Sequence, residues 1–324
     1  MTRDRPLSSL ASVAEETTIA SMTDAVDVTA PTEERNPASA GIDRMSTLEV
    51  LELLNDQDTT VPVAVRAVLP DLAGLVDAAV ARIRAGGTVH YFGAGTSGRL
   101  AVIDAAELPP TFGSPPGLFV AHHAGGTLAL LAALENVEDD EEAGRREASG
   151  LTAADVAVGL TASGRTPFVA GALRAARDHG ALTALVTAHP ESEIGGLVDH
   201  VVAPATGPEA VTGSTRLKAG TAQKLVLNGF STAVMIALGR TWSNLMVDMV
   251  ATNAKLRGRV LRILREATGV DEQTARRALA DADGELKPAL LQLFSGLPAA
   301  EGRRLLDAHG GSVAAVLGAV APVR

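Results

Sequence analysis

The stretch "VHYFGAGTSGRLAVIDAAELPP", residues 89–110, decides the fold. A short apolar run leads into a literal G-x-G-x-x-G at Gly93, Gly95 and Gly98, and a helix-like segment follows. A strand, a glycine loop and a helix in this order are typical of an α/β domain that holds a phosphate at a helix N-terminus. The pattern fits both a dinucleotide and a single phosphate ester, so the neighbouring residues have to separate these ligands.

Four further apolar runs repeat this arrangement along the chain. They are "GLFVAHHAGG", "DVAVGLTASG", "LTALVTAHP" and "HVVAPATG", and each ends in a loop rich in glycine or small polar residues. Strands that alternate with helices predict a parallel sheet covered on both faces. We therefore predict an α/β fold, a three-layer α-β-α sandwich with a parallel five-stranded sheet, whose ligands bind at the carboxyl ends of the strands.

The segments before and after these runs differ from them in composition and periodicity. Residues 1–30 are rich in Ser, Thr, Ala and acids without a sustained period, which predicts a disordered N-terminal tail. Residues 31–267 form the predicted main domain with its flanking helices, and Ser46 is a candidate N-cap for an early helix. Residues 268–324 predict a small, all-helical C-terminal appendage.

A weak repeat lies within this C-terminal part. "RRALADADGELKPAL" (276–290) aligns with "RRLLDAHGGSVAAVL" (303–317) through an Arg pair, a glycine turn and a closing leucine. One interpretation is a helix–turn–helix unit used twice. The other is coincidence in an alanine-rich helical tail.

Composition and charge exclude several functional classes. The formal net charge of −10 argues against a nucleic-acid partner, because a phosphate backbone requires a basic surface. No stretch approaches the ~20 apolar residues of a membrane helix, and the first residues lack the apolar core of a secretory signal, so we expect a soluble, cytoplasmic protein. The absence of cysteine excludes disulfides and thiolate metal sites.

The residues around the first glycine loop favour a single phosphate ester. A dinucleotide fold places an Asp or Glu at the end of the next strand to bind the ribose, but this sequence has His122 and His123 there. Thr96 and Ser97 crowd a pyrophosphate, whereas their hydroxyls suit one phosphate group. We therefore reject the dinucleotide interpretation.

A second loop supports this choice. "TASGRTP", residues 161–167, follows another apolar run and places hydroxyls at Thr161, Ser163 and Thr166 before a helix. Either loop alone is more often a capped helix start than a binding site. Two such loops on one sheet predict a site for a phosphomonoester.

Three segments carry a family resemblance. "GAGTSGRLAVIDAAELPPTFG" (93–113), "ASGRTP" (162–167) and "GPEAVTGSTRLKAGTAQKLVLN" (207–228) resemble the N-acetylmuramic acid 6-phosphate etherase family, whose core is a sugar isomerase (SIS) domain. The similarity spans residues 32–264, and the C-terminal part is similar to the family's small ubiquitin-associated-like appendage. The resemblance implies a cytoplasmic lyase of peptidoglycan recycling and amino sugar catabolism. It also implies a homodimer that needs no metal or organic cofactor.

The resemblance assigns two catalytic carboxylates. Removal of D-lactate from the sugar by elimination requires a base at C2 and an acid at the departing oxygen, and two carboxyl groups with separated pKa values can supply both. Glu107 matches the family's proton donor in "DAAELPP", and Glu138 matches the second glutamate, which we assign as the base. The residues alone do not favour Glu138 over Glu135; the two can share a helix face, and a solvated helix surface is the simpler interpretation of this acidic run.

Seven residues are candidates for binding the sugar phosphate. They are Thr96, Ser97, Ser163, Thr166, Ser214, Thr215 and Lys218. Lys218 can neutralise the phosphate or the lactate carboxylate, although outside this motif a surface lysine is the more common interpretation. His122 and His123 depart from the family pattern, and because successive strand residues point to opposite faces, we expect no shared metal.

Two other functions stay open. One is a non-catalytic phosphosugar-binding regulator, since a regulatory protein of glucokinase has this domain type. The other is an aldose–ketose phosphate isomerase on the same fold. The presence of both Glu107 and Glu138 favours the etherase.

Overall fold

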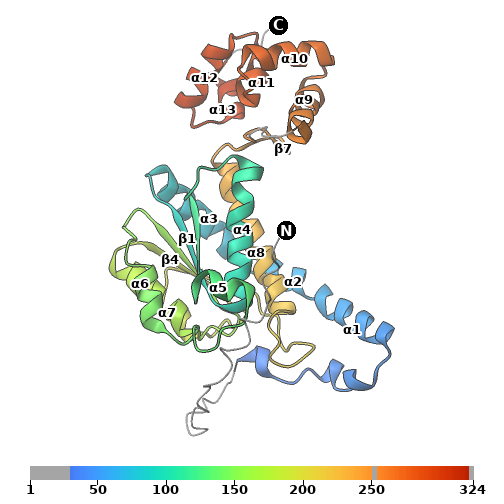
Figure 1. Ribbon diagram of the computed structural model, residues 1–324, viewed down its shortest axis with the longest axis vertical. Helices are drawn as coiled ribbons and strands as arrows, with labels where there is room; N and C mark the ends of the chain where they lie inside the picture. Colours follow the sequence, from blue (N-terminus) through green and yellow to red (C-terminus); the bar gives the residue numbers. More distant parts are fainter. Residues whose placement is uncertain (1–29, 250–253, 321–324) are drawn as a thin grey trace, which may run out of the picture.

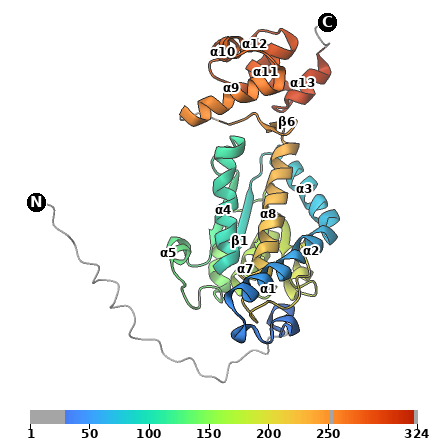
Figure 2. The same ribbon diagram turned by 90° about the vertical axis from the view of Figure 1, so that its right-hand side faces the viewer.

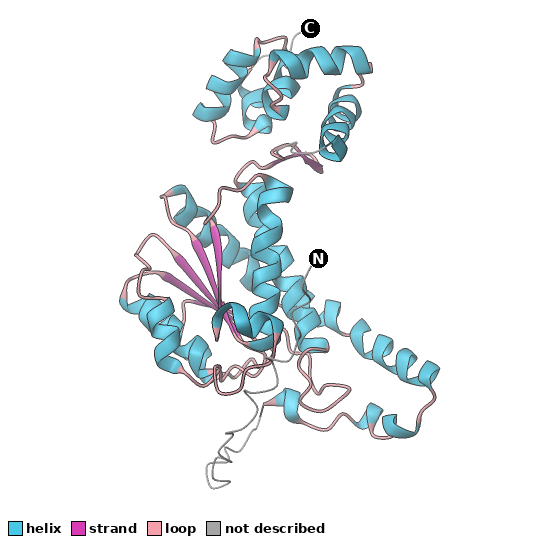
Figure 3. Ribbon diagram, viewed as in Figure 1, coloured by secondary structure: helices cyan, strands magenta, loops and turns pink. Residues whose placement is uncertain are grey.

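A parallel five-stranded sheet forms the centre of the molecule, as the apolar runs predict. The computed structural model describes residues 30–249 and 254–320, so the predicted tail lies outside the described residues except for Ala30. The strands have the spatial order β2-β1-β3-β4-β5. Figure 1 labels β1 and β4, and Figure 3 shows the sheet in magenta. They are β1 (Val89–Gly93), β2 (Phe119–His123), β3 (Val156–Leu160), β4 (Leu182–Val186) and β5 (His200–Val202). All neighbouring pairs are parallel.

Helices cover both faces of this sheet, which confirms the three-layer prediction. Alternate side chains of β1 enter different cores: Tyr91 packs against the helices of one face and Phe92 against those of the other. The first face carries α2 (Val61–Ala67), α3 (Leu69–Arg84), α4 (Gly95–Phe112) and α8 (Lys218–Ala237). The second carries α6 (Glu141–Glu147) and α7 (Pro167–Asp178). A strand buried on both faces explains the nearly continuous apolar runs.

The chain enters the domain through short helical turns and one capped helix. Ser46 caps α1 (Thr47–Thr59): its hydroxyl accepts from the Glu49 N–H, and the Glu49 carboxylate accepts from the Ser46 N–H. The 3-10 turns are η2 (Pro31–Glu33), η3 (Pro37–Ser39), η4 (Ile42–Arg44) and η5 (Glu193–Leu197), and a one-and-a-half-turn helix, α5 (Gly126–Leu131), follows β2.

The C-terminal region is a separate group of helices joined by a small hairpin. The hairpin consists of β6 (Thr241–Trp242) and β7 (Leu245–Met246) and was not expected from the sequence. The helices are α9 (Ala254–Thr268), α10 (Glu272–Asp281), α11 (Leu286–Ser295), α12 (Ala299–Ala308) and α13 (Val313–Ala319). The predicted division at residue 268 stays a prediction, and because α9 shares a core with α10 and α11, this packing argues for a division before α9.

The two copies of the weak repeat have the same local structure. The first is α10, a turn at Gly284 with φ +86°, and α11. The second is α12, a turn at Gly310 and Gly311 with φ of +63° and +77°, and α13. Because both turns use left-handed glycines between two helices, the structure favours the repeated helix–turn–helix over coincidence.

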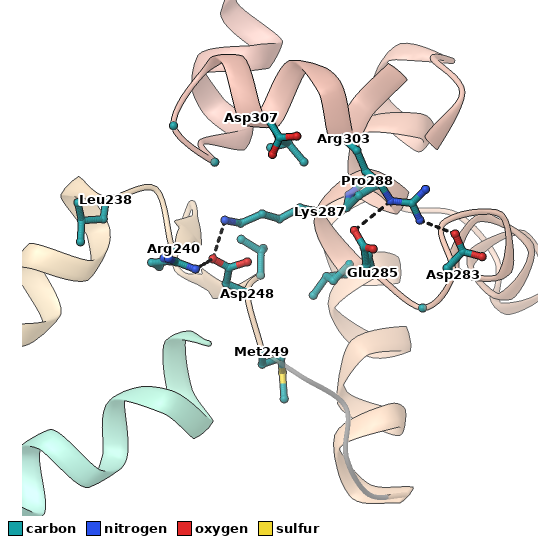
Figure 4. A pocket seen from close by; sticks show the side chains of 16 residues that line it. Leu238, Arg240, Asp248, Met249, Asp283, Glu285, Lys287, Pro288, Arg303 and Asp307 are labelled. Atoms are coloured by element: carbon teal, nitrogen blue, oxygen red, sulfur yellow. Dashed lines mark hydrogen bonds and ion pairs between the residues drawn. The ribbon is translucent and has the colours of Figure 1, made fainter. Parts of the chain in front are cut away.

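The helical group lies at one end of the sheet, beside the C-terminal end of α4 (Figures 1 and 2). A Cβ atom on Gly113, which ends α4, would lie 1.9 Å from the carbonyl oxygen of Asp248. Since α4 begins at the carboxyl end of β1, this contact is at the amino ends of the strands. A cavity of about 770 Å³ lies at this junction, lined by Arg240, Asp248 and Lys287 among others (Figure 4). No helix among the described residues has the length and apolar surface to cross a membrane.

Candidate active site

The loops that follow β1 and β3 meet at the point where the sheet reverses its order. β1 and β3 are neighbours, but the chain leaves β1 toward β2 and leaves β3 toward β4. Ligands of open parallel sheets bind at such a point, outside the carboxyl ends of the strands. We call these segments the β1 loop (residues 93–97) and the β3 loop (residues 161–166). Both hydroxyl-rich loops of the sequence prediction are therefore at the expected place.

The three glycines around the β1 loop have different tasks. A Cβ atom on Gly93 would lie 2.8 Å from the Gly98 nitrogen, and one on Gly98 would lie 2.5 Å from the Gly93 oxygen. These two glycines let β1 and α4 approach closely. Gly95 has φ +52° and no atom within 4 Å of a Cβ position. The first N–H groups of α4 lack intrahelical partners, so the open side at Gly95 suits an anion.

The β3 loop is a connected group of hydroxyls. The Thr161 hydroxyl lies 2.8 Å from the Thr166 hydroxyl and 3.5 Å from that of Ser163, and it accepts from the Gly164 N–H. His189 Nδ1 lies 3.2 Å from the Ser163 carbonyl oxygen. Thr161 is buried, whereas Ser163 and Thr166 are half-buried. The hydroxyls of Ser163 and Thr166 are therefore the ones in this loop that remain partly accessible to a ligand.

The start of α8 brings the two loops together. Ala219 packs against Ala162 of the β3 loop, and a Cβ atom on Gly220 would lie 3.5 Å from the Thr96 side chain. One turn later, Gln223 accepts a 2.8 Å hydrogen bond from the Ser97 hydroxyl. The distinctive "GSTRLKAGT" block is therefore adjacent to both loops. Ser214 and Thr215 are half-buried in the turn that precedes this helix.

A buried glutamate just before this block was missed by the sequence analysis. Glu209 is completely buried, and its two oxygens accept the N–H groups of Lys218 and Ala219, each at 2.9 Å. Burial raises the pKa of Glu209, while these N–H bonds and Lys218 oppose the rise. The N-terminus of α8 is thus already bound to a protein carboxylate. The only sequence signal was an acidic residue shortly before a helix start.

Lys218 is not the surface lysine of the simpler interpretation. Only 5% of it is exposed, and its ammonium group donates to Gln57 Oε1 at 3.3 Å. Burial lowers the pKa of Lys218, and the nearby carboxylates of Glu209 and Asp58 oppose this. Gln57 also accepts from Asn36, so Lys218 ties α8 to the entry segment of the domain.

A cavity of about 390 Å³ connects the β1 loop with the segment between α5 and α6, residues 132–140, which we call the acidic loop. Its lining includes Gly95 and His123 together with Glu135 and Glu138. This segment forms a loop between α5 and α6, so the expected shared helix face of Glu135 and Glu138 is wrong. The backbone carbonyl of Glu138 accepts from the Phe168 N–H at 3.0 Å. Glu138 is thereby attached to the first turn of α7, directly after the β3 loop, and we find no such attachment for Glu135 among the described residues.

Arg99 is a second residue that the sequence analysis missed. Its guanidinium donates to the carbonyl oxygens of Ala129, Leu130 and Ala132 at 2.6, 3.0 and 3.2 Å. These are carbonyl groups at the end of α5, which have no helical partners of their own. Arg99 therefore fixes the point at which the acidic loop leaves α5, and it also lines the cavity.

The two adjacent histidines point to opposite faces of β2, as predicted. His123 lies between two carbonyl oxygens, with Nδ1 2.7 Å from Ala124 and Nε2 3.2 Å from Gly95. His122 Nδ1 lies 2.8 Å from Glu147 on the other face. His123 thus joins the end of β2 to the β1 loop, whereas His122 stacks on Phe92 and contacts His90 on the other face.

Glu107 lies apart from the cavity within one chain. It is exposed on α4, ten residues after Ser97, which corresponds to about 15 Å along the helix axis. Large apolar side chains are exposed on α4 and α5, namely Ile103 (59%), Leu128 (74%) and Leu131 (89%). The catalytic role of Glu107 stays a prediction.

The fold and the paired loops define an α/β domain of the SIS type. Residues 71–177 match the family model described as the glucokinase regulatory protein N-terminal SIS domain. The N-acetylmuramic acid 6-phosphate etherase of Thermobifida fusca is 59% identical over 268 residues, covering 83% of this chain and 88% of that protein. The protein of that name from Pectobacterium atrosepticum is 52% identical over 281 residues, covering 86% and 93%. The chain belongs to the N-acetylmuramic acid 6-phosphate etherase family.

Proposed function

We propose that the protein cleaves the D-lactyl ether of N-acetylmuramic acid 6-phosphate, giving N-acetylglucosamine 6-phosphate and D-lactate. It is a carbon–oxygen lyase that acts in the cytoplasm, in peptidoglycan recycling and amino sugar catabolism. Relatives of that name at 51–59% identity support this function. The observation that carries it is the position of Glu138, which lines the cavity beside Gly95 and is attached to α7 next to the β3 loop.

The phosphate binds between the two loops. The free N–H groups at the start of α4 and the hydroxyls of Ser97, Ser163 and Thr166 surround it, with Thr96 beside them. Ser214 and Thr215 contact the sugar from the turn before α8. The reaction needs no metal or organic cofactor.

The chemistry is an elimination followed by hydration. Opening of the sugar ring makes C1 an aldehyde, which acidifies the proton on C2. Glu138 removes this proton, the C3–O bond breaks, and Glu107 protonates the departing lactate oxygen. Water then adds at C3 of the unsaturated aldehyde while a proton returns to C2, so the two glutamates exchange roles.

A homodimer completes this proposal. Ile103, Leu128 and Leu131 present exposed apolar surface close to the acidic loop and on the helix that carries Glu107. Large apolar side chains gathered on a surface mark an interaction site. A second copy packed against this face would bring Glu107 of one chain toward the cavity of the other, which is the arrangement that the mechanism requires.

Substitution of the two glutamates tests the mechanism. We expect Glu107→Gln and Glu138→Gln to lower kcat for D-lactate release by about 10²- to 10⁴-fold, the usual contribution of a general acid or base. Glu135→Gln is the matched control, because Glu135 lines the same cavity, and it should stay within threefold of wild type. Loss of activity in Glu135→Gln with normal turnover in Glu138→Gln would move the role of base to Glu135.

A second candidate is a phosphosugar-binding regulator without turnover. The match of residues 71–177 to the glucokinase regulatory protein SIS domain favours it. Calorimetry and a D-lactate assay on the same sample separate the two functions. A regulator binds the muramic phosphate and leaves its ether intact, whereas the etherase releases one D-lactate per sugar.

A further inference from the structure

Gln223 has an unusual environment for a buried amide. Only 2% of the residue is exposed, and its Oε1 accepts the Ser97 hydroxyl at 2.8 Å. Its Nε2 is buried without a hydrogen-bond partner. A buried donor without a partner is costly and is seldom retained without a reason. The amide lies one turn beyond Gly220, next to the β1 loop, so ligand binding at this loop can supply the reason.

The hydrogen bond between these side chains conflicts with phosphate binding by Ser97. A serine hydroxyl has one proton, and here Ser97 donates it inward to Gln223. The hydroxyl then presents only lone pairs to the site. A phosphate ester oxygen is an acceptor as well, so this arrangement gives no hydrogen bond between Ser97 and the phosphate.

A turn of the amide group resolves the conflict. If the Gln223 amide rotates by half a turn, Nε2 donates to Ser97 Oγ, and the hydroxyl proton becomes free for a phosphate oxygen. The rotation requires no backbone movement and adds one hydrogen bond to the ligand. Glutamine is suited to this task because one planar group carries both an acceptor and a donor.

We propose that Gln223 is a positioning residue for phosphate binding: its amide accepts the Ser97 proton in the orientation seen here, and after rotation it donates to the Ser97 oxygen and frees that proton for the phosphate. The proposal rests on the proposed function, because that function assigns the phosphate to the β1 loop. Gln223 acts through Ser97 and does not touch the substrate. Its effect is therefore on KM, since the phosphate is remote from the C2–H and C3–O bonds.

A double-mutant cycle tests this role. We expect Gln223→Met, which keeps the size of the side chain, to raise KM about tenfold with kcat within twofold, the loss of one hydrogen bond to a charged group. Gln223→Glu keeps the acceptor and removes the donor, so it should raise KM at least as much. In the Ser97→Ala background, Gln223→Met should change KM less than twofold, because its partner is absent.

Gln292→Met is the matched control. Gln292 also has one buried amide atom without a partner, Oε1, but lies on α11 in the C-terminal helices. Its substitution should leave KM unchanged. An equal rise of KM by Gln223→Met in both backgrounds, or no rise in either, would overturn the proposal.

A binding measurement separates this inference from the proposed function. The affinity of the four cycle proteins for N-acetylglucosamine 6-phosphate, measured by calorimetry, should show the same non-additive pattern as KM. If wild type releases no D-lactate but the binding cycle is non-additive, the proposed function fails and the role of Gln223 holds. If D-lactate is released and the cycle is additive, Gln223 has no positioning role. Thermal unfolding of each variant identifies those that fail to fold.

Discussion

Individual glycines in the β1 loop differ in what they tolerate. We expect Gly98→Ala to destabilise the protein by about 1–3 kcal/mol or more, because the new methyl group would lie 2.5 Å from the rigid Gly93 carbonyl oxygen. Gly95→Ala should cost only about 1 kcal/mol, since the position is strained by its positive φ but has free space. Urea unfolding measures both. Equal losses would mean that close packing of β1 and α4 does not decide the first result.

Asp104 gives the stability of the domain a pH dependence. It is buried and accepts hydrogen bonds from Tyr91, Asn228 and Ser231, each at 3.0 Å. Burial raises the pKa of Asp104, and these hydrogen bonds only partly oppose it. A raised pKa in the folded state means that its stabilising contribution is complete below the unfolded pKa of about 4 and is lost as pH rises through the folded value.

We therefore expect Asp104→Asn to remove a pH-dependent decline in the free energy of unfolding. Relative to this variant, wild type should lose free energy of unfolding as pH rises from about 4, measured by urea denaturation at several pH values. Asp155 is the control of opposite sign. Its burial alone would raise the pKa, but hydrogen bonds from Thr152 and Thr88 outweigh this and leave it lowered. Relative to Asp155→Asn, wild type should gain stability as pH rises toward the unfolded pKa of about 4 and stay level above it, because the folded pKa of Asp155 is lowered. Parallel curves for wild type and Asp104→Asn would contradict the assignment.

Among the elements, the acidic loop is one whose structure could not be predicted from the sequence. "ALENVEDD" has the composition of a helix surface, but the segment is a loop because Arg99 binds the carbonyl groups at the end of α5 and Asn136 adopts φ +63°. The contact joins residues about thirty positions apart. Local propensity carries no information about such a contact. It also could not predict that Glu209 accepts the N–H groups at the start of α8.

Arg99 provides a test at this scale. We expect Arg99→Lys to lower kcat by roughly 10- to 100-fold, because a lysine cannot bind three carbonyl groups in the arginine geometry and a small displacement of Glu138 is costly. Hydrogen exchange of residues 132–140 should become faster. Arg177→Lys is the control: Arg177 donates to the Leu197 carbonyl at 3.2 Å and does not line the cavity. Unchanged exchange in Arg99→Lys would contradict this role.

The strands were predictable for a physical reason. The central strands β1, β3 and β4 are largely buried on both faces, so their runs are nearly all apolar, while the edge strands β2 and β5 are less buried and have shorter apolar runs. The loops that follow parallel strands had to meet at one edge. The hairpin β6–β7 was not predictable, since strands of two residues in an apolar region have no detectable period. The sequence therefore predicted where the candidate site lies and which hydroxyls line it. It did not predict the residues that position these hydroxyls, because they act through contacts between distant parts of the chain.

At the scale of the whole molecule, one carboxylate joins the two parts of the chain. Asp248 Oδ2 lies 2.7 Å from Arg240, which follows α8, and 2.7 Å from the ammonium of Lys287 on α11 (Figure 4). Lys287 is 8% exposed, and its burial lowers its pKa while Asp248 opposes this. The ion triad stabilises the position of the C-terminal helices against the end of α8.

Removal of the Asp248 carboxylate should uncouple the unfolding of the C-terminal helices from that of the sheet domain. We expect Asp248→Asn to destabilise the C-terminal helices by about 1–3 kcal/mol, because it leaves a buried ammonium without its counter-ion. Calorimetry should resolve two unfolding transitions in place of one. Asp307→Asn is the control, since Asp307 lines the same cavity and makes no ion pair within the described ranges. A single transition at the wild-type temperature would contradict the coupling.

The open side of Gly95 has a consequence for how the protein responds to change. Main-chain N–H groups supply part of the predicted binding of the ligand, and an exchange to any amino acid other than proline, which also restricts the backbone, leaves them in place. A systematic alanine scan will therefore underestimate this loop and assign its contribution to neighbouring side chains. Replacement of a single amide by an ester, through chemical synthesis, is the experiment that would reveal its share.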